Sequence, residues 1–243
     1  MLNEGQTASV LVVDDDVDIC RNMSDILSDL GYDVEVAHDG NSALERVRQR
    51  SFDIALLDLK MPGMDGLTLY GEIKKMRAGM VAILVSAYAT GRTLDDAMAT
   101  GVWQVVPKPV EFRRLMTFVE EALGQPLVLI VDDDRELCDT LWDLLREQGY
   151  RVCLAHDVSE ATQRLRDTTY QAVLIDVRLP DGDGGQVYQQ VKQTNPQART
   201  IVITGHSPDA EPKVIALLAE GTDAVHYKPF DIPKLLATLE QVV

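Results

Sequence analysis

The stretch FDIALLDLKMPGMDG, residues 52–66, decides the fold. An apolar run, IALL, ends in Asp58 and is followed at once by proline and glycine. A short apolar run bounded by turn residues is typical of a strand that is buried on both faces, as in a parallel sheet. Asp58 would then lie at the carboxyl end of the strand, where open α/β sheets place their functional crevice. The stretch therefore predicts a parallel α/β domain with a site at Asp58.

The same arrangement returns as YQAVLIDVRLPDGDGG at residues 170–185, with Asp176 in the place of Asp58. The offset is constant, because Asp14 and Asp132, Asp58 and Asp176, and Ser86 and Thr204 are all 118 residues apart. Lys108 and Lys228 are 120 residues apart, which a two-residue insertion explains. An internal repeat of this length indicates a duplicated domain.

A chain of 243 residues matches two domains of roughly 100–150 residues each. The boundary falls in ALGQPLVLI, because Gly124 can end a helix and Pro126 cannot continue one. We therefore expect domains at 1–124 and 125–243.

Apolar runs alternate with amphipathic stretches in each copy, which is the pattern of βαβ units. Right-handed crossovers then give a doubly wound α/β domain. In the first copy we expect strands near 10–13, 33–37, 54–57, 82–85 and 103–106, and helices near 17–30, 41–50, 66–76, 93–100 and 111–123.

The composition, with 46% hydrophobic and 26% charged residues, is that of a soluble globular protein. The longest apolar runs are far shorter than the roughly 18 residues of a membrane span, and the polar start lacks the apolar segment of a signal peptide. We therefore expect a cytoplasmic protein with no membrane partner and with reduced cysteines. The net charge of −16 argues against a nucleic-acid partner, because phosphate binding needs a basic face.

Polar side chains end the predicted strands. In the first copy these are Asp14 and Asp15 after the first strand, Asp58 after the third, Ser86 after the fourth and Lys108 beyond the fifth. The second copy offers Asp132, Asp133, Asp176, Thr204 and Lys228 in the same order. Clustered carboxylates raise one another's pKa values, so the arrangement favours a bound cation. Mg²⁺ is the natural cation, because it takes hard oxygen ligands from one or two carboxylates and from phosphates.

This set of residues suits phosphoryl transfer to a carboxylate. An aspartate can act as nucleophile through an acyl-phosphate, and a metal neutralises charge on the transferring group. Asp58 is then the acceptor, while Lys108 and Ser86 bind the phosphoryl oxygens. A single acid at a strand end often only caps the next helix. Five matching roles at equal spacing in two copies favour a site instead.

Both halves resemble receiver domains of bacterial two-component response regulators. The first half carries VVDDD, DLKMPGMDG, VSA and PKP, and the second carries IVDDD, DVRLPDGDG, ITG and YKPF. The resemblance covers nearly the whole chain. It implies two flavodoxin-like (βα)5 domains, each with a parallel five-stranded sheet of order 2-1-3-4-5.

The resemblance also implies a role for each matching residue. Asp58 and Asp176 would be the phosphoacceptors. Asp15 and Asp133 would bind Mg²⁺ directly, with Asp14 and Asp132 as acidic neighbours and the main-chain carbonyls of Lys60 and Arg178 as further ligands. Ser86 and Thr204 match the switch hydroxyl of the family, Lys108 and Lys228 match its lysine, and Pro109 and Pro229 are expected to follow cis peptide bonds.

Two departures from the family pattern concern the output movement of the domains and the lifetime of their phosphorylated state. Val105 and Val225 stand three residues before the lysines, where receivers usually carry an aromatic switch residue, which argues against the usual tyrosine-coupled movement. Lys60 with Tyr88, and Arg178 with His206, occupy positions that tune dephosphorylation in the family. We expect these bulky pairs to hinder attacking water and to slow hydrolysis.

The expected function is that of a dual receiver. It would accept phosphoryl groups from a histidine kinase or phosphotransfer protein and switch a surface for a downstream protein or effector domain, without turning over a substrate. One alternative is a fragment of a larger response regulator or hybrid kinase, in which one receiver serves as a docking or dimerisation scaffold, and a homodimer is compatible with this. The other is a magnesium-dependent phosphatase, although such enzymes carry a second acid where this chain has Lys60 and Arg178.

Overall fold

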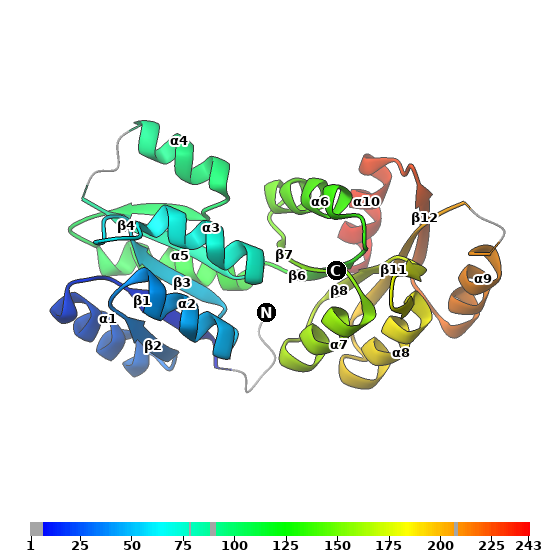
Figure 1. The fold of residues 1–243 in the computed structure, drawn as a ribbon, viewed down its shortest axis with the longest axis horizontal. Helices are drawn as coiled ribbons and strands as arrows, with labels where there is room; N and C mark the ends of the chain where they lie inside the picture. The colour runs from blue at the N-terminus through cyan, green and yellow to red at the C-terminus, as the bar shows by residue number, and fades with distance from the viewer. Residues whose placement is uncertain (1–6, 78, 88–90, 207–208) are drawn as a thin grey trace. The chain divides into compact units, whose positions relative to one another are not determined.

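The structure, a computed structural model, describes residues 7–77, 79–87, 91–206 and 209–243. The chain divides between Gln125 and Pro126 into two compact units, each with a central sheet flanked by helices (Figure 1). Tyr88, one of the residues expected to slow hydrolysis, lies outside the described residues. Within those residues no helix is long and apolar enough to cross a membrane.

The first unit alternates strands and helices along the chain. Its elements are β1 (Ser9–Val13), α1 (Val17–Asp29), β2 (Asp33–Ala37), α2 (Gly40–Gln49), β3 (Ile54–Asp58), α3 (Gly66–Met76), β4 (Val81–Ser86), α4 (Gly91–Thr100), β5 (Gln104–Pro107) and α5 (Phe112–Gly124). The strands pair in parallel in the order β2-β1-β3-β4-β5, which confirms the predicted sheet.

Strand β3 shows why its sequence is apolar at each position before Asp58. Ile54 and Leu56 enter a core that includes buried residues of α1 and α5. Ala55 and Leu57 enter a second core, formed with α2, α3 and α4 on the other face. Because successive side chains of a strand point to opposite faces, a sheet that is covered on both sides needs apolar residues throughout.

The second unit repeats this plan. Its elements are β6 (Leu127–Val131), α6 (Arg135–Glu147), β7 (Arg151–Ala155), α7 (Val158–Asp167), β8 (Ala172–Ile175), β9 (Arg178–Leu179), β10 (Gly182–Asp183), α8 (Gly184–Thr194), β11 (Arg199–Gly205), α9 (Glu211–Glu220), β12 (Ala224–Lys228) and α10 (Ile232–Val242). Its five-stranded sheet has the order β12-β11-β8-β6-β7, which is the order of the first unit read from the other edge. The short antiparallel pair β9 and β10 was not predicted.

Aspartates begin equivalent helices in the two units. The third residue of each acidic triplet, Asp16 or Asp134, accepts hydrogen bonds from main-chain N–H groups in the first turn of α1 or α6. Asp65 and Asp183 cap α3 and α8 in the same way. A carboxylate at this position satisfies N–H groups that have no partner within the helix. Capping therefore accounts for one acid of each triplet and leaves the other two for the site.

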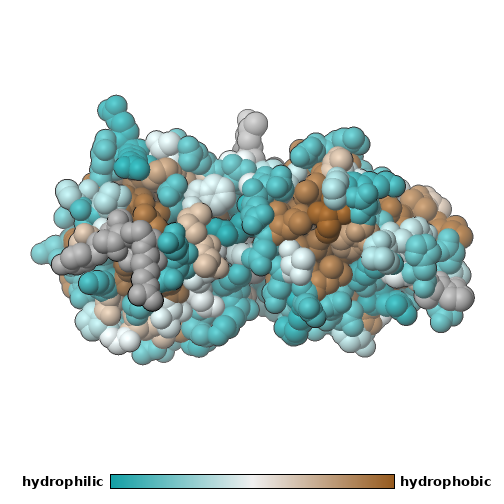
Figure 2. Space-filling model, turned by 90° about the horizontal axis from the view of Figure 1, so that it is seen from above, coloured by the Kyte–Doolittle hydropathy of each residue, from teal (hydrophilic) through white to brown (hydrophobic). Residues whose placement is uncertain are grey.

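Some apolar side chains remain on the surface. Figure 2 shows hydrophobic residues gathered in patches among hydrophilic ones on one face of the molecule. The large exposed apolar residues include Val17, Ile26 and Leu30 at α1, and Ile215 and Leu218 on α9.

Candidate functional site

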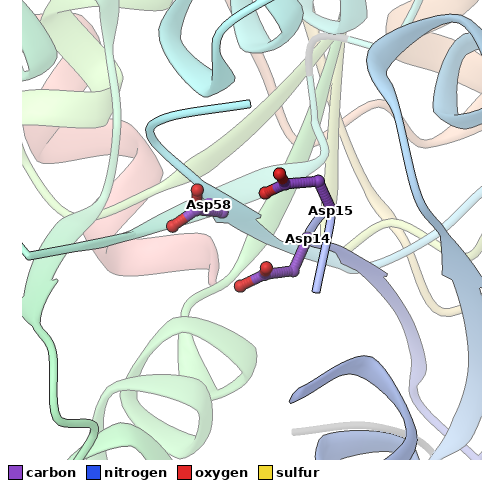
Figure 3. A group of neighbouring side chains, drawn as sticks. All are labelled: Asp14, Asp15 and Asp58. Carbon is purple, nitrogen blue, oxygen red and sulfur yellow. The ribbon is translucent and has the colours of Figure 1, made fainter. Parts of the chain in front are cut away.

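The first unit brings its predicted site residues together at the carboxyl ends of its strands. Asp14 follows β1 and Asp58 ends β3, and these two strands are neighbours in the sheet. Figure 3 shows both carboxylates close to that of Asp15. Lys108, which follows β5, places its Nζ atom 2.8 Å from Oδ2 of Asp14 and 2.6 Å from Oδ1 of Asp58. One ammonium group therefore joins two buried carboxylates.

Main-chain N–H groups fix the other carboxylate oxygens. The N–H of Asp16 donates to Oδ1 of Asp14 at 2.9 Å. The N–H of Lys60 donates to Oδ2 of Asp58 at 3.0 Å. Hydrogen bonds from such donors favour the charged form of a carboxylate and hold its orientation.

The donor set of this cluster fits a divalent cation. Asp14, Asp15 and Asp58 each offer a carboxylate oxygen, and these atoms lie within 4.8 Å of one another. Three carboxylates and one ammonium group leave an excess of two negative charges. Mg²⁺ prefers oxygen ligands of this kind and retains several waters, so the exposed Asp15 beside two buried acids suits it.

Burial and ion pairing act in opposite directions on the charged groups of this site. Burial raises the pKa of Asp58, against the lowering influence of Lys108. Burial alone would lower the pKa of Lys108, but its hydrogen bonds to Asp14 and Asp58 hold that pKa above the ordinary value. Lys108 is therefore positively charged at neutral pH, and its charge favours the ionised form of Asp58.

The second unit repeats the arrangement. Asp132 follows β6 and Asp176 follows β8, while Asp133 is exposed beside them. The carboxylate oxygens that these acids offer again lie within 4.8 Å of one another. Nζ of Lys228 forms an ion pair with Asp132 and another with Asp176, the latter at 2.7 Å. The N–H of Arg178 donates to Oδ1 of Asp176 at 3.1 Å.

The charged groups of the second site follow the same physical pattern. Burial raises the pKa of Asp132, which is fully buried, and Lys228 opposes that shift. Burial would lower the pKa of Lys228, but hydrogen bonds to Asp132 and Asp176 outweigh it and raise the value. The pKa shifts of the two lysines thus have the same direction and the same cause.

The two predicted hydroxyls end strands beside the acidic clusters. Ser86 ends β4 and is buried, and its main-chain carbonyl accepts a hydrogen bond of 2.8 Å from the N–H of Lys108. Thr204 lies near the end of β11 and is fully buried. Its Oγ1 atom has no hydrogen-bond partner among the described residues. A buried hydroxyl without a partner is costly, and it points to a ligand that supplies an acceptor.

Sequence reasoning did not assign two cysteines and a histidine to this region. The Sγ atoms of Cys20 and Cys138 donate to the main-chain carbonyls of Asp14 and Asp132, at 3.2 and 3.3 Å. Burial raises the pKa of Cys20 to about 11 and that of Cys138 to about 12, so both thiols stay protonated. Nδ1 of His156 lies 3.0 Å from the same carbonyl of Asp132. The constant offset of 118 residues between the cysteines was the signal that could have revealed their shared role.

The residues next to Lys108 and Lys228 include the two prolines and the two valines that the sequence analysis singled out. The Lys108–Pro109 and Lys228–Pro229 bonds are cis, as predicted. Val105 is buried in the core of the first unit, and Val225 packs against the core of the second. An aromatic ring does lie near the second lysine, because Tyr227 directly precedes Lys228.

Both units of the chain are similar to known proteins. Residues 10–120 and 128–240 each match the family model of the response regulator receiver domain. A response regulator receiver protein of Anaeromyxobacter sp. (strain Fw109-5) is 32% identical over 233 residues, which cover 96% of this chain and 94% of the relative. The transcriptional regulatory protein ZraR of Escherichia coli (strain K12) is 37% identical over 115 residues, which are 47% of this chain but only 26% of ZraR.

Solved structures match single units of the chain. A CheY-like receiver domain protein from Methanospirillum hungatei JF-1 is 33% identical, with a TM-score of 0.47 over 49% of this chain and 94% of that protein. The response regulator TrrA from Thermotoga maritima, solved in complex with Mg²⁺ and BeF, is 31% identical with a TM-score of 0.44, over 48% of this chain and 99% of that protein. Two family matches and a relative that spans nearly the whole chain establish that this protein is a tandem member of the response regulator receiver domain family.

Proposed function

We propose that this protein accepts phosphoryl groups on Asp58 and Asp176 from a histidine kinase or a histidine phosphotransfer protein. One repeated observation carries the proposal. In each unit a single lysine ammonium group joins two buried carboxylates at the ends of neighbouring strands, beside a third, exposed carboxylate. Repulsion between the carboxylates of such a cluster favours added positive charge, and the cluster suits an anionic group that arrives together with a cation.

Mg²⁺ is the proposed cofactor. Asp14, Asp15 and Asp58, with the main-chain carbonyl of Lys60, would hold it in the first unit. Asp132, Asp133, Asp176 and the carbonyl of Arg178 would do so in the second. When bound, the cation neutralises charge on the oxygens of the transferring phosphoryl group.

The proposed transfer is a displacement at phosphorus. A carboxylate oxygen of Asp58 or Asp176 forms the new P–O bond, while the bond between phosphorus and the histidine nitrogen of the donor breaks, and its electron pair stays on that nitrogen. Lys108 or Lys228 places its ammonium group against the phosphoryl oxygens as a point charge. Ser86 or Thr204 donates its hydroxyl to another of these oxygens.

The proposed outcome is a change of binding surface. An aspartyl phosphate adds about −1.5 to −2 charges and new acceptor oxygens, which favour an inward position of the switch hydroxyl. The partner of the switched surface would be a downstream protein or an effector domain. We propose a cytoplasmic location for this signalling step.

Intact-mass measurement after treatment with acetyl phosphate and Mg²⁺ tests the proposal. We expect two added phosphoryl groups on the wild type and one on either Asp58→Asn or Asp176→Asn. The double variant should take up none. Loss of all label in a single variant would mean that only one copy is active, and an unlabelled wild type would reject the phosphoacceptor function.

Matched controls come from the helix-capping acids. Asp65 and Asp183 each follow an acceptor by seven residues, and each caps the next helix without belonging to an acidic cluster. Asp65→Asn and Asp183→Asn should still take up two phosphoryl groups. Loss of label in either control would show that the assay responds to general damage of the loop.

We propose that the protein does not turn over a phosphoester substrate. The position two residues after each acceptor holds Lys60 or Arg178, whose N–H groups donate to the acceptor carboxylates. These positions therefore lack the second acid expected of an aspartyl-phosphate phosphatase. Steady hydrolysis of p-nitrophenyl phosphate that disappears in the double variant Asp58→Asn/Asp176→Asn would contradict this.

A further inference from the structure

The loop between β8 and α8 is fastened to the start of α7, the helix that lies beside α8 (Figure 1). Oδ1 of Asp181 accepts a hydrogen bond of 2.7 Å from the N–H of Val158, and Oδ2 accepts one of 3.1 Å from the N–H of Ser159. The N-cap of the helix, Asp157, accepts from the next N–H, that of Glu160, at 2.7 Å. Because the first N–H groups of a helix have no partner within it, a carboxylate from a distant loop here completes the cap.

Asp181 lies at the tip of the β9–β10 hairpin, and Arg178 lies at its base. Pro180 and Asp181 connect the two strands, and Arg178 pairs with Asp183 across them. The N–H of Arg178 donates to the carboxylate of Asp176 at 3.1 Å, and its carbonyl is the one proposed to bind the cation. A two-stranded hairpin is only marginally stable by itself. The bonds from its tip to α7 therefore help to hold the Arg178 main chain in place.

The start of α7 also contacts the other side of the acidic cluster. His156 stands two residues before the helix, and its Nδ1 atom lies 3.0 Å from the main-chain oxygen of Asp132. The N–H of His156 donates to Oε2 of Glu160 at 2.9 Å. The N–H of Asp132 donates to the carbonyl of Ala155 at 3.0 Å. One helix end thus supports both the strand end that carries Asp132 and the hairpin that follows the acceptor.

The two units make this contact between loop and helix with exchanged side chains. Gly40 begins α2, and a Cβ atom on it would lie 2.8 Å from Sδ of Met64 in the loop. In the second unit the larger residue, Val158, is on the helix, and the loop has a glycine. A Cβ atom on that residue, Gly182, would lie 2.9 Å from Cγ2 of Val158. Each loop is therefore fitted closely to its own helix.

The carboxylate at the tip of the loop is specific to the second copy. Gly63, which stands 118 residues before Asp181, has no side chain and has a φ of 83°. No described residue other than glycine has a positive φ, so the two loops follow different paths. Residues 59–65, all of which the structure describes, contain no strand. The second unit thus adds a hairpin and its attachment to a site that the two units otherwise share.

We propose that Asp181 is a positioning residue for the Asp176 site, a role that rests on the proposed function. By fastening the hairpin to α7, it holds the Arg178 main chain ready for the cation and the phosphoryl group. A group that is held in advance loses less conformational freedom on binding. Loss of Asp181 should therefore weaken cation binding at the second site and leave the first site unchanged.

The first readout is a titration of the full chain with Mg²⁺, followed by the amide NMR signals of Arg178 and Lys60. Their N–H groups donate to Asp176 and Asp58, so each signal reports on one site. Asp181→Ala should weaken binding at the Arg178 signal roughly tenfold, as is usual when a group that orients a metal ligand is lost. The Lys60 titration should not change. Asp181→Asn keeps one acceptor oxygen and should have an intermediate effect.

The second readout is hydrogen exchange in EDTA, which measures the order of the loop without a cation. In Asp181→Ala the amide of Arg178 should exchange severalfold faster than in the wild type. The amides of Val158 and Ser159, which lose their acceptor, should also exchange faster. Equal exchange of the Arg178 amide in the wild type and Asp181→Ala would show that Asp181 does not order the hairpin, and would overturn the proposal.

Asp157→Ala is the matched control, because it removes the local cap of the same helix and leaves the hairpin attached. In a Trp103→Phe background, the fluorescence of Trp142 follows urea unfolding of the second unit. Asp157→Ala should lower the urea midpoint at least as much as Asp181→Ala does, without changing the Arg178 titration. If Mg²⁺ affinity falls in step with stability in both variants, Asp181 has a merely structural role and the proposal is overturned.

The Arg178 signal also separates this proposal from the proposed function. If Mg²⁺ moves the signal and Asp181→Ala binds the cation as tightly as the wild type, the positioning role is overturned while the proposed function stands. If Mg²⁺ leaves the signal unmoved in the wild type, the proposed cation site of the second unit fails, and the positioning role fails with it.

Discussion

At the scale of single residues, one lysine in each unit offsets part of the cost of burying charged carboxylates. Burial raises the pKa of Asp58 and of Asp132, which opposes the charged form that a nucleophile or a cation ligand needs. Lys108 contacts Asp14 and Asp58, and Lys228 contacts Asp132 and Asp176. These ion pairs favour the charged form of the carboxylates. Each lysine compensates for only one of its two buried carboxylates, so the clusters retain a preference for a further cation.

Arg178 gives a prediction about the lifetime of the phosphorylated state. Its guanidinium nitrogen Nη2 lies 3.6 Å from the position that a Cβ atom on Gly205 would occupy, so the side chain extends over the end of β11. Arg178→Asn keeps the main-chain N–H that binds Asp176 but removes this cover. We expect loss of phosphate from Asp176 to become roughly fivefold faster, which corresponds to about 1 kcal/mol of barrier.

Radiolabel decay after removal of the phosphodonor measures this rate, in an Asp58→Asn background that leaves one labelled site. Arg166→Asn, at an exposed arginine in the last turn of α7, is the control and should decay like the wild type. Unchanged decay in Arg178→Asn would show that the arginine does not shield the acyl phosphate. In the first unit Lys60→Asn should act in the same direction.

At the scale of elements, the sequence predicted most of the fold. The expected strands and helices of the first unit agree with the observed ones to within two residues, because apolar runs and helix periodicity are both local signals. The hairpin of β9 and β10 was missed, since two-residue strands leave no periodic pattern. Tyr227 was missed for a different reason. It pairs with Thr204 across the sheet, which no spacing along the chain reveals.

The start of α3 carries a prediction about close packing beside the acceptor. A Cβ atom on Gly66 would lie 2.3 Å from the main-chain oxygen of Asp58, and one on Gly184 would lie 2.4 Å from that of Asp176. Because main-chain atoms cannot turn aside as a flexible side chain can, Gly66→Ala must displace the helix or the acceptor. We expect it to destabilise the first unit by roughly 1–3 kcal/mol and to slow phosphorylation of Asp58.

Gly71→Ala is the matched control in the same helix. A Cβ atom there would meet nothing within 4 Å, so this change should stabilise the unit, by about 0.5–1 kcal/mol. Each unit has one tryptophan, Trp103 or Trp142, so urea unfolding of the first unit can be followed by Trp103 fluorescence in a Trp142→Phe background. Equal stability of the two alanine variants would refute the close approach at Gly66.

At the scale of the whole molecule, the chain repeats one acidic cluster in each of two compact units. The cores of the first unit and that of the second share no residue, and each unit has its own cluster of three acids. The net charge of −16 adds a general repulsion to the local excess of negative charge at each cluster. The duplication therefore predicts that a divalent cation stabilises the two units separately.

Stability measurements with Mg²⁺ and in EDTA test this prediction, because the two conditions should have different effects on the stability of each variant relative to the wild type. A ligand that binds only the folded state at ten times its Kd adds about 1.4 kcal/mol to the stability of the unit that holds it. Asp15→Asn should remove this gain from the first unit only, and Asp133→Asn from the second only, as followed by the tryptophan of each unit. In EDTA the same variants should be as stable as the wild type or more stable, because each substitution relieves repulsion between carboxylates. Asp18→Asn, at an exposed acid outside the cluster, should keep the full gain. If Asp15→Asn lowers stability equally with and without Mg²⁺, Asp15 has a structural role and the cation site of the first unit is rejected.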